Sequence, residues 1–410
     1  MNGNWAFNWV LIMHHNWPAL GRRFALVTLV AAAGVIALPA EIGSKVMIYL
    51  AASTLVMALL MGLLFDTRRA AGLHLGLSLL ILLLTFGMAG WFLNEVNTRD
   101  ALLGGVVVLT MMTSNLVHLL GAVLREMARG QFQHDAVAEG LKHNAGPILL
   151  ANLTTVLGFV ISAWINPDLS PMAWIVSLGA LASLWVTLTW LPWILLRWFL
   201  EFRVGNPQDR HGYGRLVRWL SRHRWLPRLI AGGGLLLLVG LSSWAVMTMG
   251  TQFMAIAVML GVTFLLLMVV WSHWGMAALA VALNWGAVVC AAWLWVGLTN
   301  QSLSPFALLV PLGLVIDDSI HFFTRYVRAM HMGLLDTPLL RVRFALGSVG
   351  RTIWMTSLLL IAGLSVLLLV GDALIVQAVY LTGIAMLLAT WLLIVWLPAL
   401  LLSYRVETNK

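Results

Sequence analysis

Two adjacent carboxylates stand near the middle of an apolar segment, PLGLVIDDSIHFFTRY, at residues 311–326. His321 follows Asp317 by four residues and Asp318 by three, so a helix would place it on the same face, one turn further on. An ionised carboxylate inside a membrane costs several kcal/mol unless it is paired, protonated or wetted, so acids at that depth favour a functional role. The segment predicts a site that handles charge within a membrane-spanning helix.

Proton binding is the chemistry that suits these three residues best. Burial and a neighbouring carboxylate both favour the neutral acid, so such a pair can take up and release protons near neutral pH. His321 would be the next station of a proton relay, because imidazole titrates in the same range. The alternative is a structural role, in which the polar groups hold helices together by hydrogen bonds.

Enzymatic and metal-binding roles fit these residues less well. An intramembrane aspartyl protease needs two carboxylates that face each other, whereas neighbours on one helix diverge by about 100°. The other histidines show no ligand spacing with the pair, and the chain has no glycine-rich phosphate loop with Lys and Ser or Thr. We therefore expect no enzyme activity, no catalytic residue, no metal site and no cofactor.

Composition places these residues in a polytopic membrane protein. Of the 410 residues, 61% are hydrophobic and only 10% are charged. A soluble domain is nearer half apolar and a quarter charged. The expected fold class is therefore an all-α membrane protein.

Twelve runs are long and apolar enough to cross a bilayer, which takes about 17–25 residues in a helix. Six lie in each half of the chain. In order, they are residues 24–40, 46–65, 75–93, 101–124, 147–165, 172–196, 225–248, 253–272, 276–298, 305–323, 352–370 and 373–402.

The placement of lysine and arginine sets the expected orientation, since cytoplasmic segments carry the excess of positive charge. With both termini in the cytoplasm, all of the 24 basic residues except Lys45 and Arg99 lie on the inner side. The net charge of +9 is therefore a topology signal, and nucleic acid is not an expected partner. The longest inner connector, 201–224, predicts either a basic amphipathic helix on the inner leaflet or a plain basic loop.

The two halves resemble one unit used twice. SNLVHLLGAVLREM at 114–127 aligns with DDSIHFFTRYVRAM at 317–330. Two shorter matches keep nearly the same offset along the chain: Gly158 with Gly363, and WLP at 190–192 with WLP at 396–398. We expect two parallel six-helix repeats, at 1–200 and 225–410, joined by the connector.

Polar residues on the predicted neighbouring spans could support the carboxylate pair. The first repeat has three of them at the positions that align with the acidic pair and its histidine, namely Ser114, Asn115 and His118. On the eleventh span, Thr356 and Ser357 lie at a similar depth. An intramembrane hydroxyl also bonds readily to its own helix backbone, which is the competing explanation for the last two.

At these residues the sequence resembles the resistance-nodulation-division (RND) superfamily, and within it the hydrophobe exporters of the large mycobacterial membrane protein (MMPL) type. GLVIDDSIHFFTRY is similar to that family's tenth-span pattern of glycine, acidic pair and histidine. GRTIWMTSLLLIAGLSVLLL, followed by WLPALL, resembles its eleventh and twelfth spans. The resemblance covers nearly the whole chain, is specific in the second half and faint in the first, and implies a twelve-helix RND-type membrane domain.

This resemblance implies a transporter in the bacterial inner membrane that uses proton-motive force to move hydrophobic or lipid-like molecules. The role of binding the coupling proton falls on Asp317 and Asp318, with His321 in support. The alternative is a non-transporting RND-like subunit or lipid-sensing regulator that works with a partner. Protons and membrane lipids are the other expected partners, and a homo-oligomer stays open.

Two features differ from the family pattern. The connectors at 41–45 and 249–252 are too short to hold the large extracytoplasmic domains that the family inserts there. The fourth span has Ser114 and Asn115 where an acidic pair could stand. Substrate capture would then use the membrane domain itself or a partner protein that supplies the extracytoplasmic domains.

Overall fold

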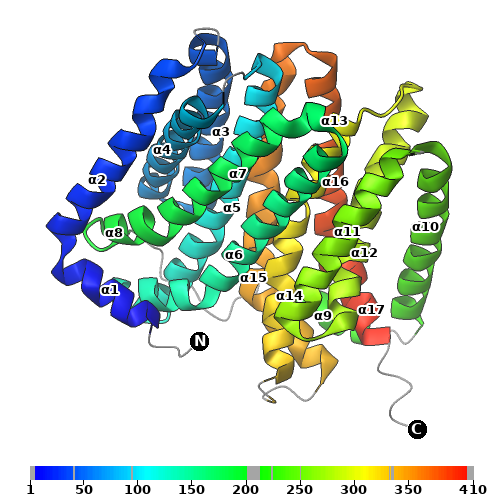
Figure 1. Cartoon of the computed structure of the whole chain (residues 1–410). Coiled ribbons are helices and arrows are strands. Elements are labelled where there is room, and N and C mark those ends of the chain that lie inside the picture. The colour runs from blue at the N-terminus through cyan, green and yellow to red at the C-terminus, as the bar shows by residue number, and fades with distance from the viewer. Residues whose placement is uncertain are drawn as a thin grey trace. The chain divides into compact units, whose positions relative to one another are not determined.

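The chain is helical throughout the residues that the structure describes, apart from short turns and connectors. The structure is a computed structural model that describes residues 5–39, 42–93, 96–200, 213–222, 225–249, 251–331, 333 and 337–403. Among these, 11 helical segments are long and apolar enough to cross a membrane. A further helix of 21 residues, Thr251–Trp271, is apolar over its described part. Together they match the twelve predicted spans one for one (Figure 1).

The helices form two compact units, the first containing Met1–Pro207 with Leu358–Val376 and the second Gln208–Ser357 with Gln377–Lys410. The first half of the chain supplies α1 (Trp5–His15), α2 (Trp17–Ala33), η1 (Gly34–Ala37), η2 (Ile42–Val46), α3 (Met47–Phe65), α4 (Arg68–Phe92), α5 (Thr98–Ala128), α6 (Gln133–Ile165), η3 (Pro167–Leu169), α7 (Ser170–Trp185), η4 (Val186–Trp190) and α8 (Leu191–Leu195). The second half supplies α9 (Tyr213–Arg222), α10 (Leu226–Met249), α11 (Thr251–Trp271), α12 (Trp274–Thr299), α13 (Pro305–Leu314), α14 (Ile316–His331), α15 (Pro338–Ser365), η5 (Val366–Val370), α16 (Ala373–Trp391), η6 (Leu392–Trp396) and α17 (Leu397–Ser403).

The bounds of the helices repeat between the two halves. The spans Gln133–Ile165 and Pro338–Val370 both contain 33 residues, and their ends keep the same offset as Gly158 and Gly363. Likewise α5 ends at Ala128 and α14 at His331, one residue beyond the end of the aligned motif in each case. The internal repeat seen in the sequence therefore extends to the helix boundaries.

The repeat also includes a local irregularity of the helix. In both halves a π-helical turn, η4 or η6, leads directly into the proline of the WLP motif, so the two turns keep the offset of that motif. Proline lacks an N–H and its ring presses on the carbonyl four residues earlier, so the helix widens before it. For Pro192 that carbonyl belongs to Leu188, and the indole N–H of Trp9 donates to it at 3.0 Å.

The core of the first unit is built around α5, which packs against α4, α6 and α7. Of the residues in the apolar centre of this span, 94% are buried. The corresponding value is 83% for the α13–α14 span and only 17% for α10. The two spans that carry the aligned motifs are thus the most enclosed ones, which suits helices that hold polar side chains within a membrane.

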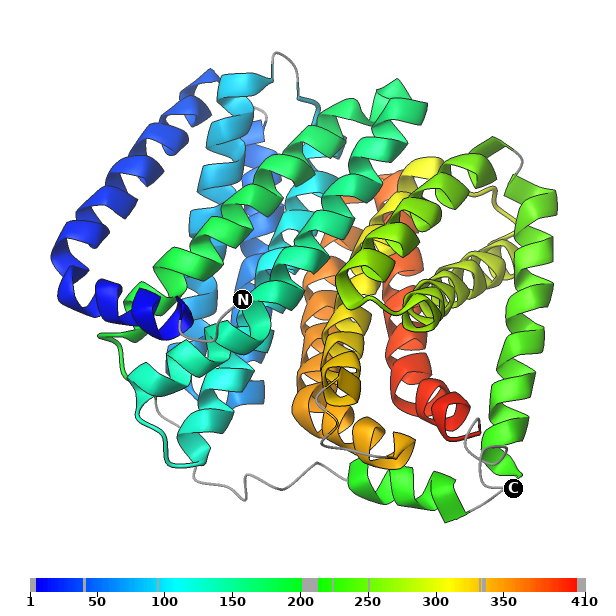
Figure 2. The same cartoon turned by 60° about the horizontal axis from the view of Figure 1, so that its bottom comes forward.

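Two short helices flank the predicted spans. The helix α1 was not predicted, and it packs against α6 and α8. Just after it, at the start of α2, the indole of Trp17 and that of Trp193 each donate to the other's backbone carbonyl at 2.9 Å. In the connector, α9 buries Val217 and Leu220 while its arginines are exposed, as an amphipathic helix requires. Figure 2 shows α9 as a short green helix at the bottom of the second unit. The remaining residues of 201–224 lie outside the described part of the chain.

The connector helix is held to the second unit by a tyrosine. The hydroxyl of Tyr213 donates to the carbonyl of Gly350 at 2.9 Å. Burial raises the pKa of this phenol to about 12, so it stays a neutral donor at physiological pH. A side chain at Gly350 would press into the ring of Tyr213, which explains why the smallest residue stands there.

Replacing Gly179 by leucine should destabilise the first unit. A Cβ atom at this position of α7 would overlap the side chain of Val108 on α5. Overpacking of a tight core typically costs about 1–3 kcal/mol. We expect a lower unfolding temperature in detergent for Gly179→Leu, and little change for Gly146→Leu, whose Cβ would meet open space. Equal unfolding temperatures would contradict this packing.

The proposed orientation predicts which connectors can be labelled from outside. Single cysteines at Asn97, Asp168 and Gln301, introduced after replacement of the native Cys290, should react with an impermeant thiol reagent on intact cells. A cysteine at Arg129, at the opposite end of α5 from Asn97, should react only after permeabilisation. Labelling of position 129 in intact cells would contradict this orientation and indicate the opposite one.

Candidate functional site

The carboxylate pair lies at an interruption of the tenth span. The helix α13 contains Pro311, which has no N–H to donate, and the regular helix resumes at Ile316 after Val315. Asp317 and Asp318 therefore fall in the first turn of α14, where the helix dipole favours negative charge. The sequence predicted 305–323 as one regular helix, and this interruption was missed.

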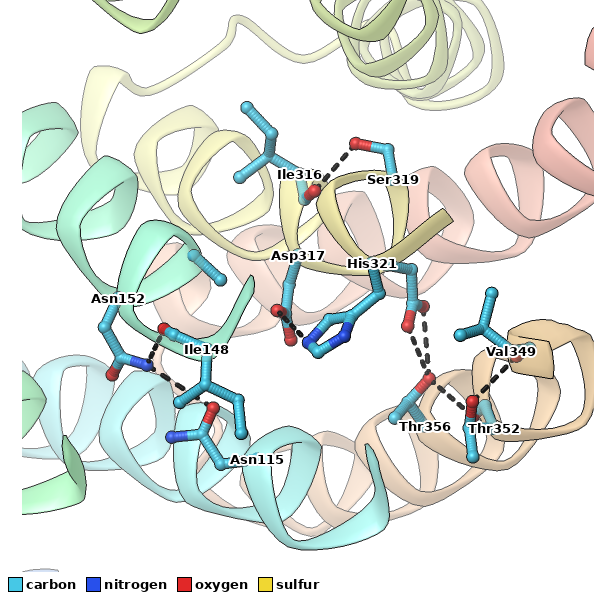
Figure 3. Close-up of polar contacts among 12 residues, drawn as sticks. Asn115, Ile148, Asn152, Ile316, Asp317, Ser319, His321, Val349, Thr352 and Thr356 are labelled. Atoms are coloured by element: carbon cyan, nitrogen blue, oxygen red, sulfur yellow. Dashed lines mark hydrogen bonds and ion pairs between the residues drawn. The ribbon is translucent and has the colours of Figure 1, made fainter. Parts of the chain in front are cut away.

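Asp318 contacts the eleventh span through a threonine. The hydroxyl of Thr356, which is fully buried, lies 2.9 and 3.1 Å from the two carboxylate oxygens (Figure 3). It also lies 2.8 Å from the carbonyl of Ile353 and 3.0 Å from that of Thr352. A hydroxyl has one proton to donate, so the carboxylate and its own helix backbone compete for it.

Asp317 points to a different partner. One of its oxygens lies 3.7 Å from Nε2 of His321, one turn along the same helix. The imidazole is 1% exposed, whereas the Asp317 side chain is 18% exposed. The two carboxylates thus diverge, as adjacent residues on a helix must, and they do not form a dyad that shares one proton.

Further hydrogen bonds connect the helices around the pair. Asn284 of α12 donates to the hydroxyl of Ser319 on α14 at 2.7 Å, and the hydroxyls of Ser357 and Thr390 lie 2.5 Å apart between α15 and α16. Of these four residues, only Ser357 was predicted from the sequence as a site residue. An asparagine in the apolar run AVALNWGAVV was the signal that could have found Asn284.

A buried cation lies on the same helix face beyond His321. Arg325 follows Asp318 by seven residues, or two helical turns, and its exposure is only 6%. Buried charges need compensating groups, and this guanidinium has an interaction partner within the chain. In the sequence it was predicted only as one of the inner basic residues.

In the first unit, the corresponding residues form an uncharged network. The side-chain amide of Asn115 donates to Ser183 on α7 at 2.8 Å, and Asn152 on α6 approaches the Asn115 carbonyl oxygen at 3.4 Å. Ser114 and His118 are buried on the same helix. This network joins α5, α6 and α7 without a carboxylate. The expectation that Ser114 and Asn115 reach the carboxylate pair stays a prediction.

The side chains of α14 and α15 place groups that can exchange protons beside one another. Within the described ranges, no three His, Cys, Asp or Glu residues cluster closely enough to hold a metal ion. Asp318 can accept a proton and exchange its contact with Thr356, and Asp317 can exchange a proton with His321 at close to hydrogen-bonding distance. The geometry thus brings together four of the predicted site residues, Asp317, Asp318, His321 and Thr356.

Comparison with known proteins gives the fold class. No protein-family model matches the sequence, and no curated protein resembles it significantly in sequence. Among solved structures, the chain is similar to SecDF from Thermus thermophilus, a translocon-associated membrane protein, with a TM-score of 0.72 and 17% identity over 88% of this chain and 62% of that one. A super-membrane-facing form of SecDF gives a TM-score of 0.64 and 16% identity over 86% and 60%.

At these identities the likeness to SecDF shows the fold alone. The chain spans about three fifths of the length of the SecDF chains that it matches. Over its described residues the chain is an all-α multi-pass membrane protein composed of two six-helix repeats, and its fold is similar to that of SecDF. The predicted fold class is therefore confirmed.

Proposed function

We propose that the protein is a proton-driven RND-like transporter, in which Asp318 binds the coupling proton. The observation that carries this proposal is the hydrogen bond between Asp318 on α14 and Thr356 on α15. A carboxylate at this depth is costly, and its partner is a hydroxyl that has other acceptors within reach. Protonation can therefore change the contact between two membrane-spanning helices.

The coupling step follows from the single proton of the hydroxyl. When Asp318 is ionised, Thr356 donates to it and holds α14 against α15. When Asp318 takes up a proton, it no longer requires this donor, and the hydroxyl turns to the carbonyl of Ile353, 2.8 Å away. A proton crossing 100 mV releases about 2.3 kcal/mol, which can bias two helix arrangements that differ in this contact.

His321 and Asp317 supply the route between the site and one face of the membrane. The proton passes from the carboxylate pair to His321, whose Nε2 is 3.7 Å from the Asp317 carboxylate. Because α14 runs on from His321 to the basic residues at its end, we assign this exit to the cytoplasmic face. This orientation places both termini in the cytoplasm of a bacterial cell, with the protein in the inner membrane.

The substrate in this proposal is a hydrophobic or lipid-like molecule, as for the MMPL-type exporters that the sequence resembles. One residue separates α10 from α11, and four separate η1 from η2, so neither connector contains a soluble substrate-binding domain. Substrate would enter from the bilayer or be received by a partner protein. We propose no chemical reaction on the substrate.

A second candidate function comes from the structural neighbours. SecDF is described as translocon-associated, and its likeness supports a role in which the same proton cycle assists a protein translocon instead of moving a lipid. The two functions share the proton site and differ in the cargo. A regulator that performs no transport, the alternative that the sequence left open, receives no support from this likeness.

The experiment that tests the proposal is proton uptake by the purified protein in liposomes. A potassium-diffusion potential, negative inside, should acidify vesicles that contain a pH-sensitive dye when wild-type protein is present. The double variant Asp317→Asn/Asp318→Asn should match protein-free vesicles. Uptake that appears only after a bacterial translocon is added would favour the second function, and equal uptake by wild type and double variant would contradict both.

A further inference from the structure

An apolar groove lies in the first unit, whereas the carboxylate pair belongs to the second. It has a volume of about 440 Å³ and is lined by α2, α4 and the end of the sixth span, including Ala25, Leu29, Gly76, Leu80 and Ile194. This volume falls within the range of about 300–1,000 Å³ that is usual for small-molecule sites. Of the residues that line the groove, only Thr28 and the indole nitrogens of its tryptophans carry polar side-chain groups.

The groove lies between two places where α2 and the turn that follows it pack closely against neighbouring segments. At one end, Gly34 and Gly87 let the backbones of the first span and α4 meet, and a side chain at either position would overlap the other helix. At the other end, Gly21 admits the ring of Trp193. Between these contacts, Gly76 faces open space, since a Cβ atom there would have no neighbour within 4 Å.

Basic residues surround one end of the groove. On α2, Arg22 precedes the lining residues Ala25 and Leu29 by three and seven residues, so it shares their face. On α4, Arg69 has the same spacing to the lining residues Gly72 and Gly76. Just after α8, Arg197 follows the lining residue Ile194 by three residues.

Two contacts bring these arginines to the same end of the unit. The guanidinium of Arg69 donates to the carbonyl of Phe199, next to the lining residue Trp198. The guanidinium of Arg197 lies 5.4 Å from the ring centre of Trp17, at the start of α2. Arg22 is exposed and makes no ion pair with the residues that the structure describes.

We propose that this groove binds one anionic glycerophospholipid. An acyl chain would fill the space between α2 and α4 beside Gly76, and the phosphate would lie among Arg22, Arg69 and Arg197. A guanidinium pairs with phosphate through parallel hydrogen bonds, and an apolar slot that opens toward lipid is better filled by a hydrocarbon chain than by water. The site lies wholly in the first unit and does not depend on the proton site.

Native mass spectrometry of the purified full-length protein tests this site. After incubation with equal amounts of phosphatidylglycerol and phosphatidylcholine, wild type should retain one phosphatidylglycerol molecule in preference. Gly76→Leu fills the groove and should lose that adduct, whereas Gly240→Leu, which also points into open space on α10, should keep it. Arg22→Gln should reduce the preference for the anionic lipid while leaving the fold intact.

The following results would overturn the proposal. They are equal retention of the two lipids by wild type, retention of phosphatidylglycerol by Gly76→Leu at the wild-type level, and loss of the adduct in Gly240→Leu as well. An adduct of detergent only would also count against it. Unfolding temperatures of the variants in detergent separate a filled groove from a misfolded protein. Because no variant touches Asp318, proton uptake can succeed or fail independently.

Discussion

The variant Asp318→Asn should abolish proton-coupled transport and leave the fold intact. Asparagine has nearly the shape of aspartate and can still accept a hydrogen bond from Thr356, but it cannot take up a proton. The contact that holds α14 to α15 would then lose its response to pH. We expect the rate at which the liposome interior acidifies under an imposed potential, reported by the dye, to fall to that of protein-free vesicles.

Asp317→Asn is the informative comparison, because it removes the neighbouring carboxylate and spares the contact with Thr356. It should reduce uptake by the same amount or slightly less, since Asp317 faces His321 and serves the route of the proton. Asp168→Asn, in an exposed connector, is the matched control and should transport normally. Normal uptake by both variants of the pair, or loss of the folded protein, would assign Asp317 and Asp318 a structural role.

Hydropathy and charge were sufficient to predict the membrane-spanning helices. All twelve predicted spans correspond to helices, because about 20 apolar residues can satisfy their backbone within a bilayer only by forming a helix. The repeat was visible at three short matches and extends to helix boundaries such as Gln133 and Pro338. The helix α1 was missed because its 11 residues are too few to span a membrane.

From the sequence, the candidate site could be predicted only for the residues that lie close together on one helix. Asp317, Asp318 and His321 lie within five residues on one helix, so their relation follows from helical geometry. The partners on other helices could not be deduced, because a hydroxyl or amide in an apolar run carries no information about which helix it faces. Asn284 and Thr390 are examples of such partners. The interruption of the helix at Val315 was also not predicted.

The pairing of Arg99 with Asp372 shows the same limitation. In the predicted topology, Arg99 is one of two basic residues on the outer side, against the general rule. In the first unit, its guanidinium lies 3.0 Å from the carboxylate of Asp372, which also accepts hydrogen bonds from the backbone at the start of α16. Burial acts to raise the pKa of Asp372, but these hydrogen bonds outweigh it and lower the pKa. The contribution of this exposed pair to stability is present at neutral pH and is lost as the pH falls through the lowered pKa.

The second large effect should come from Thr356. Thr356→Val keeps the shape of the side chain but removes the hydroxyl, so Asp318 would lose the donor that joins α14 to α15. Thr356→Ser retains the hydroxyl and is the matched control. We expect the valine variant to lose most of its proton uptake and the serine variant to keep most of it, when both are measured in liposomes under the same potential.

The two variants also separate coupling from packing. Valine fits the buried site of Thr356 but leaves the Asp318 carboxylate without this donor, so the unfolding temperature in detergent should fall modestly, while transport falls to near the protein-free level. If the contact were only structural, the valine variant would be less stable and any remaining folded protein would transport at the normal rate. A hydroxyl whose loss affects transport more than stability is what a proton-dependent contact between α14 and α15 requires, because its function lies in being broken and remade in each cycle.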